Sequence, residues 1–356
     1  MACVYRRAQL LLIGIAATMS ALAMLAAVLL GKHLVDPDGF LGPSWARLPL
    51  LVGSAFLVDL LPRTLWYSRL RPRAMPAIFR ARVRTHWSRQ RVTLVVMGVV
   101  CFYLTYVSYR NLKSFLPFVM GRTTYDRELH LVDRTLLFGH DPAIALHTLL
   151  GTGISAHFLS WIYLWFLPLV PLALTAWLVW SRKLTYGYWF ATSQCIAWTL
   201  GTVSYYALPT LGPGFEYSWL YNSLPDTPAS SLMNSLQYSR DNVLNVGIDG
   251  AVQSVAGFAS LHCAITLLVA LMVQFTLRSR VLKWVFWVNF AFTLIATIYF
   301  GWHYISDDIA GIMIALIAFY VGGVVSGQKF DSHGRTAPTP DATSPEVPVG
   351  QEAGSG

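Results

Sequence analysis

Charged residues are scarce in this chain. Asp, Glu, Lys and Arg make up 12% of its 356 residues, whereas hydrophobic types make up 55%. A soluble globular domain carries about 25% charged residues. The mean hydropathy of +0.51 points the same way. The composition therefore excludes an ordinary soluble domain and indicates a membrane protein.

Cysteine is also rare, and its four positions lie far apart in the sequence, at Cys3, Cys101, Cys195 and Cys263. This spacing gives neither a disulfide framework nor a paired-cysteine metal site. The His and Asp residues between His130 and His147 fit no compact metal-binding motif either. We therefore expect neither a metal nor another cofactor.

Long apolar runs, in contrast, are abundant. At about 20 apolar residues per membrane span, eight runs predict transmembrane helices, and Asp59, Pro62 and Arg63 interrupt the second of them. The predicted helices cover residues 9–31, 48–67, 92–109, 154–180, 186–207, 255–277, 284–301 and 305–326. The predicted fold is thus an all-α, polytopic membrane protein.

Three regions follow from this pattern. Residues 1–91 would hold two N-terminal helices and a basic loop, residues 92–326 a six-helix membrane core, and residues 327–356 a disordered tail rich in Pro, Ser and Thr. The first apolar run follows Arg6 and Arg7 as in a secretory signal, but it exceeds the usual ~7–15 residues of such a signal. We expect it to be a retained helix.

The basic residues predict an orientation in the cell membrane. With the N-terminus inside, 18 of the 26 Lys and Arg residues fall in cytoplasmic segments, as the positive-inside rule requires. Both termini would then be cytoplasmic. The cluster Arg69–Arg91 contains no acidic residue and suits anionic inner-leaflet lipids. The net charge of +9 therefore needs no nucleic-acid partner.

Two histidines lie at the extracytoplasmic ends of predicted helices. His262 opens one apolar run, and His303 stands between two others, four residues before Asp307. Ionisable groups near a bilayer mark functional sites by default. On a helix, Asp307 could contact His303 and fix its tautomer, leaving the other ring nitrogen free as a base or a nucleophile. His262 could protonate a leaving oxygen. A plain structural contact between His303 and Asp307 remains the alternative.

These strings resemble a known family. Ser260-Leu-His262 and His303-Tyr-Ile-Ser-Asp307 are similar to two signatures of the type 2 phosphatidic acid phosphatase superfamily, and most closely to its inositol phosphorylceramide synthase-like branch. The resemblance covers about residues 92–326. It implies a six-helix core in which His303 is the nucleophile, Asp307 its partner and His262 the general acid. Asp308 is adjacent but lies about 100° around the helix.

The chain also departs from the soluble phosphatase pattern. Ala259 and Leu261 replace Pro and Gly, Thr297 replaces an Arg, and the turn at residues 205–214 has no Lys or Arg. Other groups must then bind the phosphate. The candidates are Arg110 and Lys113 at the end of the third span, Arg240, and the Ser260 hydroxyl. Interfacial snorkelling is the alternative for Arg110.

The expected function is transfer of a phosphoryl or phospho-headgroup group from a lipid phosphate or phospholipid through a phosphohistidine. The missing phosphatase-type arginines favour an inositolphosphotransferase-like lipid phosphotransferase over a lipid phosphate phosphatase, in which water is the acceptor. A transporter or assembly protein of the same fold is a third possibility. Segments 110–153 and 208–254 are predicted to form interfacial helices and a lid over the site.

Overall fold

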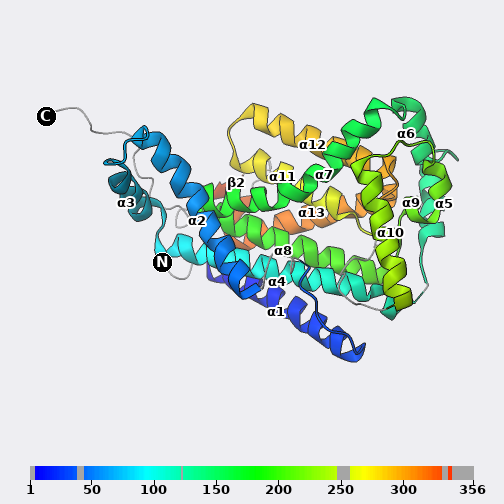
Figure 1. Cartoon of the computed structure of the whole chain (residues 1–356), viewed down its shortest axis with the longest axis horizontal. Helices are drawn as coiled ribbons and strands as arrows, with labels where there is room; N and C mark the ends of the chain where they lie inside the picture. Colours follow the sequence, from blue (N-terminus) through cyan, green and yellow to red (C-terminus); the bar gives the residue numbers. More distant parts are fainter. Residues whose placement is uncertain (1–4, 38–43, 122, 247–256, 331–335, 339–356) are drawn as a thin grey trace.

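Long helices pack side by side in this chain and form an elongated bundle (Figure 1). The computed structural model describes residues 5–37, 44–121, 123–246, 257–330 and 336–338. The long helices are α1 (Arg6–Leu29), α2 (Ser44–Ser68), α4 (Arg89–Met120), α7 (Ile154–Thr175), α8 (Leu184–Ala207), α11 (Leu261–Thr276), α12 (Arg280–Tyr299) and α13 (Ile305–Val325). A π-helical turn, η2 (Ala176–Trp180), extends α7. The predicted all-α class is confirmed.

Within the described residues, six helical segments are long and apolar enough to cross a membrane. They are α1, Pro49–Ser68 of α2, α4, α7 with η2, α12 and α13. The other two predicted spans correspond to α8 and to α11, which has 16 residues. Helix α8 packs against α1, α4, α11 and α13, and its polar Thr192, Ser193 and Gln194 are fully buried. A helix surrounded by protein needs no apolar surface towards lipid, which explains its lower hydropathy.

Helix α4 is longer than the sequence predicts. It was expected to end near residue 109, but it continues to Met120. The polar residues of the extension have partners inside the protein: Asn111 hydrogen-bonds both backbone groups of Val35, and Lys113 Nζ lies 5.4 Å from the Tyr205 ring centroid. Arg110 and Lys113 therefore lie within a helix rather than at its end.

The charged residues inside α2 form a structural cluster with α3 (Met75–His86). Asp59 is buried, and its carboxylate accepts hydrogen bonds from Arg63, from Arg82 and from the indole of Trp87. A buried charge is tolerated when it is paired and hydrogen-bonded in this way. Asp59 thus joins α2 to α3 and gives no indication of a transport pathway.

The C-terminal region is not wholly as predicted. Disorder was expected from residue 327, yet β1 (Gln328–Phe330) pairs antiparallel with β2 (Thr336–Pro338). The Phe330 ring packs against Trp189, Phe319 and Tyr320. These contacts attach the short segment to α8 and α13. The rest of the tail lies outside the described residues.

Helices that do not belong to the bundle gather at one end of it (Figure 1). They are α5 (Asp126–Leu136), α6 (Pro142–Leu150), α9 (Pro213–Glu216) with the 3-10 turn η3 (Ser218–Tyr221), and α10 (Pro228–Val246), whereas α3 lies at the opposite end. The helices predicted in segment 110–153 are therefore present. In α5 the polar Asp126 and Asp133 are buried, while Leu131 and Leu136 are about half exposed. The polar residues of α5 thus face the protein and its leucines face outwards, which suits a helix with lipid on its outer side.

Candidate functional site

Both predicted histidines line one cavity of about 240 Å³ among α4, α7, α8, α10, the start of α11 and the loop before α13. The centroids of the His262 and His303 rings are 6.2 Å apart. Arg110 and Lys113 of α4 line the same cavity. Most of the remaining lining is aromatic or aliphatic and includes Tyr109, Tyr163, Trp198, Tyr205, Leu232, Leu236 and Trp302. Four of the residues selected from the sequence therefore meet in one apolar chamber.

A stack of rings holds His262. Its imidazole lies parallel to the Tyr163 ring at 4.4 Å between centroids, and Tyr163 stacks in turn on Trp302 at 5.0 Å. Phe166 contacts the same imidazole, with centroids 4.1 Å apart. Ring contacts of this kind restrict a side chain to one orientation. His262 is therefore fixed in the chamber by residues of α7 and of the loop before α13.

The segment before His262 is tied down by consecutive backbone N–H groups. Gly257 N donates to Thr210 O, and Phe258 N to Thr210 Oγ1, both at 2.8 Å. Ala259 N donates to Ser204 Oγ at 2.9 Å, and Ser260 N to Asp307 O at 3.0 Å. These bonds join the start of α11 to the end of α8 and to α13. They bring together the two signatures that are separate in the sequence.

His303 lies in the short loop between α12 and α13. Its backbone N–H donates to Thr297 O, and its ring Nδ1 is 3.4 Å from Asp307 Oδ2. The same carboxylate oxygen accepts a hydrogen bond from Tyr304 N at 3.0 Å and so caps α13. The predicted pairing of His303 with Asp307 is thus present, at a distance slightly longer than a typical hydrogen bond.

The charge state of His303 follows from its burial. Only 6% of the residue is exposed, and burial lowers the pKa of His303 to about 4; the Asp308 charge opposes this shift and the Lys113 charge favours it. The imidazole is therefore neutral at neutral pH. A neutral ring has the free lone pair that nucleophilic attack requires.

Asp308 has different partners from Asp307. Its Oδ2 accepts a 2.8 Å hydrogen bond from Thr297 Oγ1, and the Ser260 side chain also hydrogen-bonds its carboxylate. Thr297 stands at the position where the soluble phosphatase pattern has an arginine. Gly311 permits the close packing here, because a Cβ atom at this position would collide with Ser260 O. Asp308 thus joins α12, α13 and the start of α11.

The four predicted phosphate-binding residues separate into two groups. Arg110 and Lys113 line the cavity. Ser260 is fully buried, does not line it, and accepts a hydrogen bond from Cys263 N as the N-cap of α11. Arg240 lies in α10, but its side chain is outside the described part of the chain. Of the candidates whose side chains the structure describes, Arg110 and Lys113 are the two that share the cavity with the histidines.

Two aspartates of α5 contact the site segments and were not predicted from the sequence as site residues. Asp133 accepts hydrogen bonds from Ile305 N at 2.7 Å, Ser306 N at 3.2 Å and Ser306 Oγ at 3.1 Å. It therefore caps α13 from outside, next to His303. The sequence feature that could have indicated this role is the spacing of seven residues between Asp126 and Asp133, which puts both on one face of α5.

Asp126 lies about two helical turns before Asp133, at the start of α5. Its carboxylate accepts hydrogen bonds from Leu211 N and Gly212 N and from the Tyr304 hydroxyl. Gly212 has a φ of +101°, and a Cβ there would collide with Trp302 O. Helix α5 thus holds both the turn after α8 and the residue that follows His303.

We expect Asp133→Asn to lower kcat about 10-fold or more with little change in KM. The amide keeps one acceptor oxygen, whereas the carboxylate uses one for Ile305 and the other for Ser306, so the start of α13 and His303 would shift. Displacements near 1 Å can cost about 10²-fold in rate. Steady-state kinetics with a lipid substrate would measure this. Thr135→Ala, an exposed change on the same helix, is the control and should leave kcat unchanged.

The comparisons with known proteins give one match. A family model described as the PAP2 superfamily matches residues 127–321, which is more than half of the chain. The matched part contains His262, His303 and both α5-contacted segments, while Arg110 and Lys113 precede it. No curated protein and no solved structure gave a match. Because the family model covers more than half of its length, this membrane protein belongs to the PAP2 superfamily.

Proposed function

We propose that this protein transfers a phosphoryl or phospho-headgroup group from a lipid phosphate or phospholipid through a phosphohistidine on His303. The observation that carries the proposal is the shared cavity, where the two histidine rings lie 6.2 Å apart beside Lys113 and Arg110. A phosphorus atom between the rings would be within reach of both. Superfamily membership supports the general class of phosphatase or phosphotransferase chemistry.

The reaction has two steps. The ring nitrogen of His303 that does not face Asp307, Nε2, attacks phosphorus. The bond to the leaving lipid oxygen breaks, and the protonated ring of His262 gives that oxygen a proton. Asp307, near Nδ1, stabilises the imidazolium. An acceptor hydroxyl then loses its proton to His262 and attacks phosphorus, which breaks the P–N bond and restores both histidines. Lys113 and Arg110 would neutralise the phosphate oxygens.

The acceptor is proposed to be an alcohol, as in the inositol phosphorylceramide synthase-like branch. Two observations favour this over water. The cavity wall is mostly aromatic and aliphatic, which suits a lipid alcohol, and Thr297 bonds Asp308 where a phosphatase-type arginine would stand. Hydrolysis is the second candidate, because superfamily membership is compatible with a phosphatase.

The test uses purified protein in nanodiscs that contain a panel of phospholipids and lipid phosphates. Inositol, a lipid alcohol or no acceptor is added, with EDTA present throughout, and the products are identified by mass spectrometry. We expect a new phosphodiester only when the alcohol is added. Release of inorganic phosphate in all samples would instead assign a phosphatase. If no lipid in the panel is converted, a non-enzymatic role becomes the better explanation.

Lys113→Met should weaken substrate binding more than it lowers turnover. The methionine keeps an unbranched side chain, one atom shorter, beside Tyr109 and Tyr205 but removes the positive charge. A hydrogen bond to a charged group contributes about 1.5–3 kcal/mol, so KM should rise by roughly tenfold or more. Lys183→Met, a lysine outside the cavity that also lies over a tyrosine ring, is the matched control. If the two variants have the same KM and kcat, Lys113 does not take part in substrate binding.

The site is proposed to face the extracytoplasmic side of the cell membrane, with both termini in the cytoplasm. The support is the excess of Lys and Arg in the segments assigned to the cytoplasm. A cysteine substituted for the exposed His140, in a background with Cys3 changed to serine, should react with a membrane-impermeant maleimide on intact cells. If the cysteine is labelled only after the cells are lysed, this end of the protein faces the cytoplasm and the proposed orientation is wrong.

A further inference from the structure

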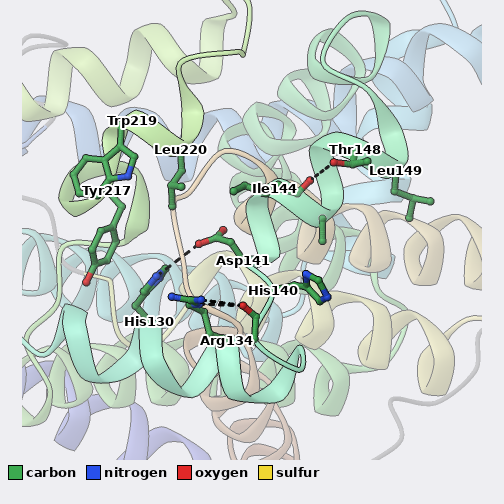
Figure 2. A pocket seen from close by; sticks show the side chains of 12 residues that line it. His130, Arg134, His140, Asp141, Ile144, Thr148, Leu149, Tyr217, Trp219 and Leu220 are labelled. Carbon is green, nitrogen blue, oxygen red and sulfur yellow. Dashed lines mark hydrogen bonds and ion pairs between the residues drawn. The ribbon is translucent and has the colours of Figure 1, made fainter.

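A second and larger cavity lies apart from the histidine chamber. It has a volume of about 900 Å³, opens on the end of the molecule between α5, α6 and η3, and shares no lining residue with the first cavity. Sites for small ligands usually measure about 300–1,000 Å³ and combine apolar surface with a few convergent polar groups. Figure 2 shows both kinds of side chain around this cavity.

Its polar groups are held in place by one another. Asp141 caps α6 through Ala143 N and lies 3.7 Å from His130 Nε2. The guanidinium of Arg134 donates from Nε and Nη2 to Gly139 O. In Figure 2, His130, Arg134 and Asp141 converge on the same space. The cavity thus offers fixed donors and acceptors close together.

Its aromatic groups form one side of the cavity. The Tyr217 ring packs on the imidazole of His130, with centroids 4.3 Å apart, and Trp219 meets Tyr217 edge to face at 5.5 Å. The Tyr217–His130 contact and the edge-to-face packing fix these rings, yet Trp219 remains 62% exposed. A large indole that is both fixed and exposed beside polar groups is typical of recognition surfaces.

We propose that this cavity binds a neutral sugar ring. Arg134 is positively charged and Asp141 negatively charged, and both line the cavity. Any charged ligand would therefore be attracted by one of them and repelled by the other. A polyhydroxyl ring can both donate to Asp141 and accept from His130 or Arg134. Its apolar C–H face can cover the exposed indole of Trp219, which would otherwise stay in contact with water.

The cavity is also connected to the histidine chamber through α5. His130 and Arg134 face the sugar cavity, while Asp126 and Asp133 of the same helix hold the segments around His303. A sugar bound beside His130 would therefore restrain the helix that caps α13. The binding proposal itself does not depend on the proposed phosphotransfer, since the two cavities have separate linings.

Saturation-transfer NMR on the protein in phosphatidylcholine nanodiscs tests this, with methyl β-D-glucopyranoside as the probe. A second sample carries a glucosylated diacylglycerol in the nanodisc, and competition between the two separates a free sugar from a lipid headgroup as the source. Inorganic phosphate and choline are the charged probes. Trp219→Ala removes the indole, and Trp284→Ala, which changes another exposed tryptophan on α12, is the matched control.

We expect saturation transfer to the glucoside in the wild type and in Trp284→Ala, weakened about tenfold or more in Trp219→Ala and in His130→Ala. The same signal should persist in His303→Ala, which separates this inference from the proposed catalysis. Displacement by the glucosylated lipid would identify a headgroup as the occupant, and its absence a free sugar. No transfer in the wild type, equal transfer in Trp219→Ala, or stronger binding of phosphate or choline than of the glucoside would overturn the proposal.

Discussion

The variant His303→Ala is expected to lose at least about 10³-fold in turnover, because in the proposed mechanism it removes the atom that attacks phosphorus. The side chain is 6% exposed and faces a cavity that His262 also lines, so alanine leaves a void without exposing new backbone. The protein should therefore still fold and insert. Turnover of a radiolabelled lipid substrate, together with covalent label retained on the denatured protein, would measure the effect.

His157→Ala provides the matched control for this experiment. His157 belongs to α7 and is exposed on the outside of the bundle, so its loss should leave turnover unchanged. His262→Ala should behave differently from both, because it removes the proton donor but keeps the nucleophile. We expect it to slow turnover by about 10²–10⁴-fold. If His303→Ala retained wild-type turnover, the histidine mechanism would be wrong, whatever the acceptor.

Local sequence signals predicted the fold class and the contact between His303 and Asp307. Apolar runs of about 20 residues define membrane helices directly. The spacing of four residues suggested a helical contact between His303 and Asp307, and the contact is present although His303 lies in the loop before α13. The presence of His262 in the same chamber could be expected only through the family resemblance and the shared membrane face. The bonds that bring it there, from Gly257 to Ser260, run to residues 40 or more positions away in sequence.

Other features could not be predicted, because they depend on pairings that sequence does not reveal. The length of α4 was underestimated because the polar Arg110 and Asn111 suggest an exposed helix end. In the structure, Asn111 hydrogen-bonds the backbone of Val35, in the segment that follows α1. Asp133 was considered only as a metal ligand, although its partners are backbone N–H groups of α13. A carboxylate that caps a distant helix looks in sequence like any surface residue.

The roles of the adjacent carboxylates are separable by the paired variants Asp307→Asn and Asp308→Asn. In Asp307→Asn, the amide oxygen can still accept the hydrogen bond from Tyr304 N. The substitution removes the negative charge that, in the proposed mechanism, stabilises the imidazolium of His303. It also permits the wrong ring tautomer, a change that costs about 10⁴-fold in the serine protease triad. We expect a loss of roughly 10³-fold in kcat.

Asp308→Asn should cost less than about tenfold, because an amide oxygen can still accept the hydrogen bond from Thr297 and the group makes no direct contact with the His303 ring among those described. Single-turnover rates of both variants show which aspartate supports His303, and thermal unfolding checks that both variants fold. The reverse order would mean that His303 turns towards Asp308 when substrate is bound. The electrostatic influence of Asp308 on His303 would then reflect the catalytic pairing, and the contact of 3.4 Å to Asp307 would be a structural cap of α13 alone.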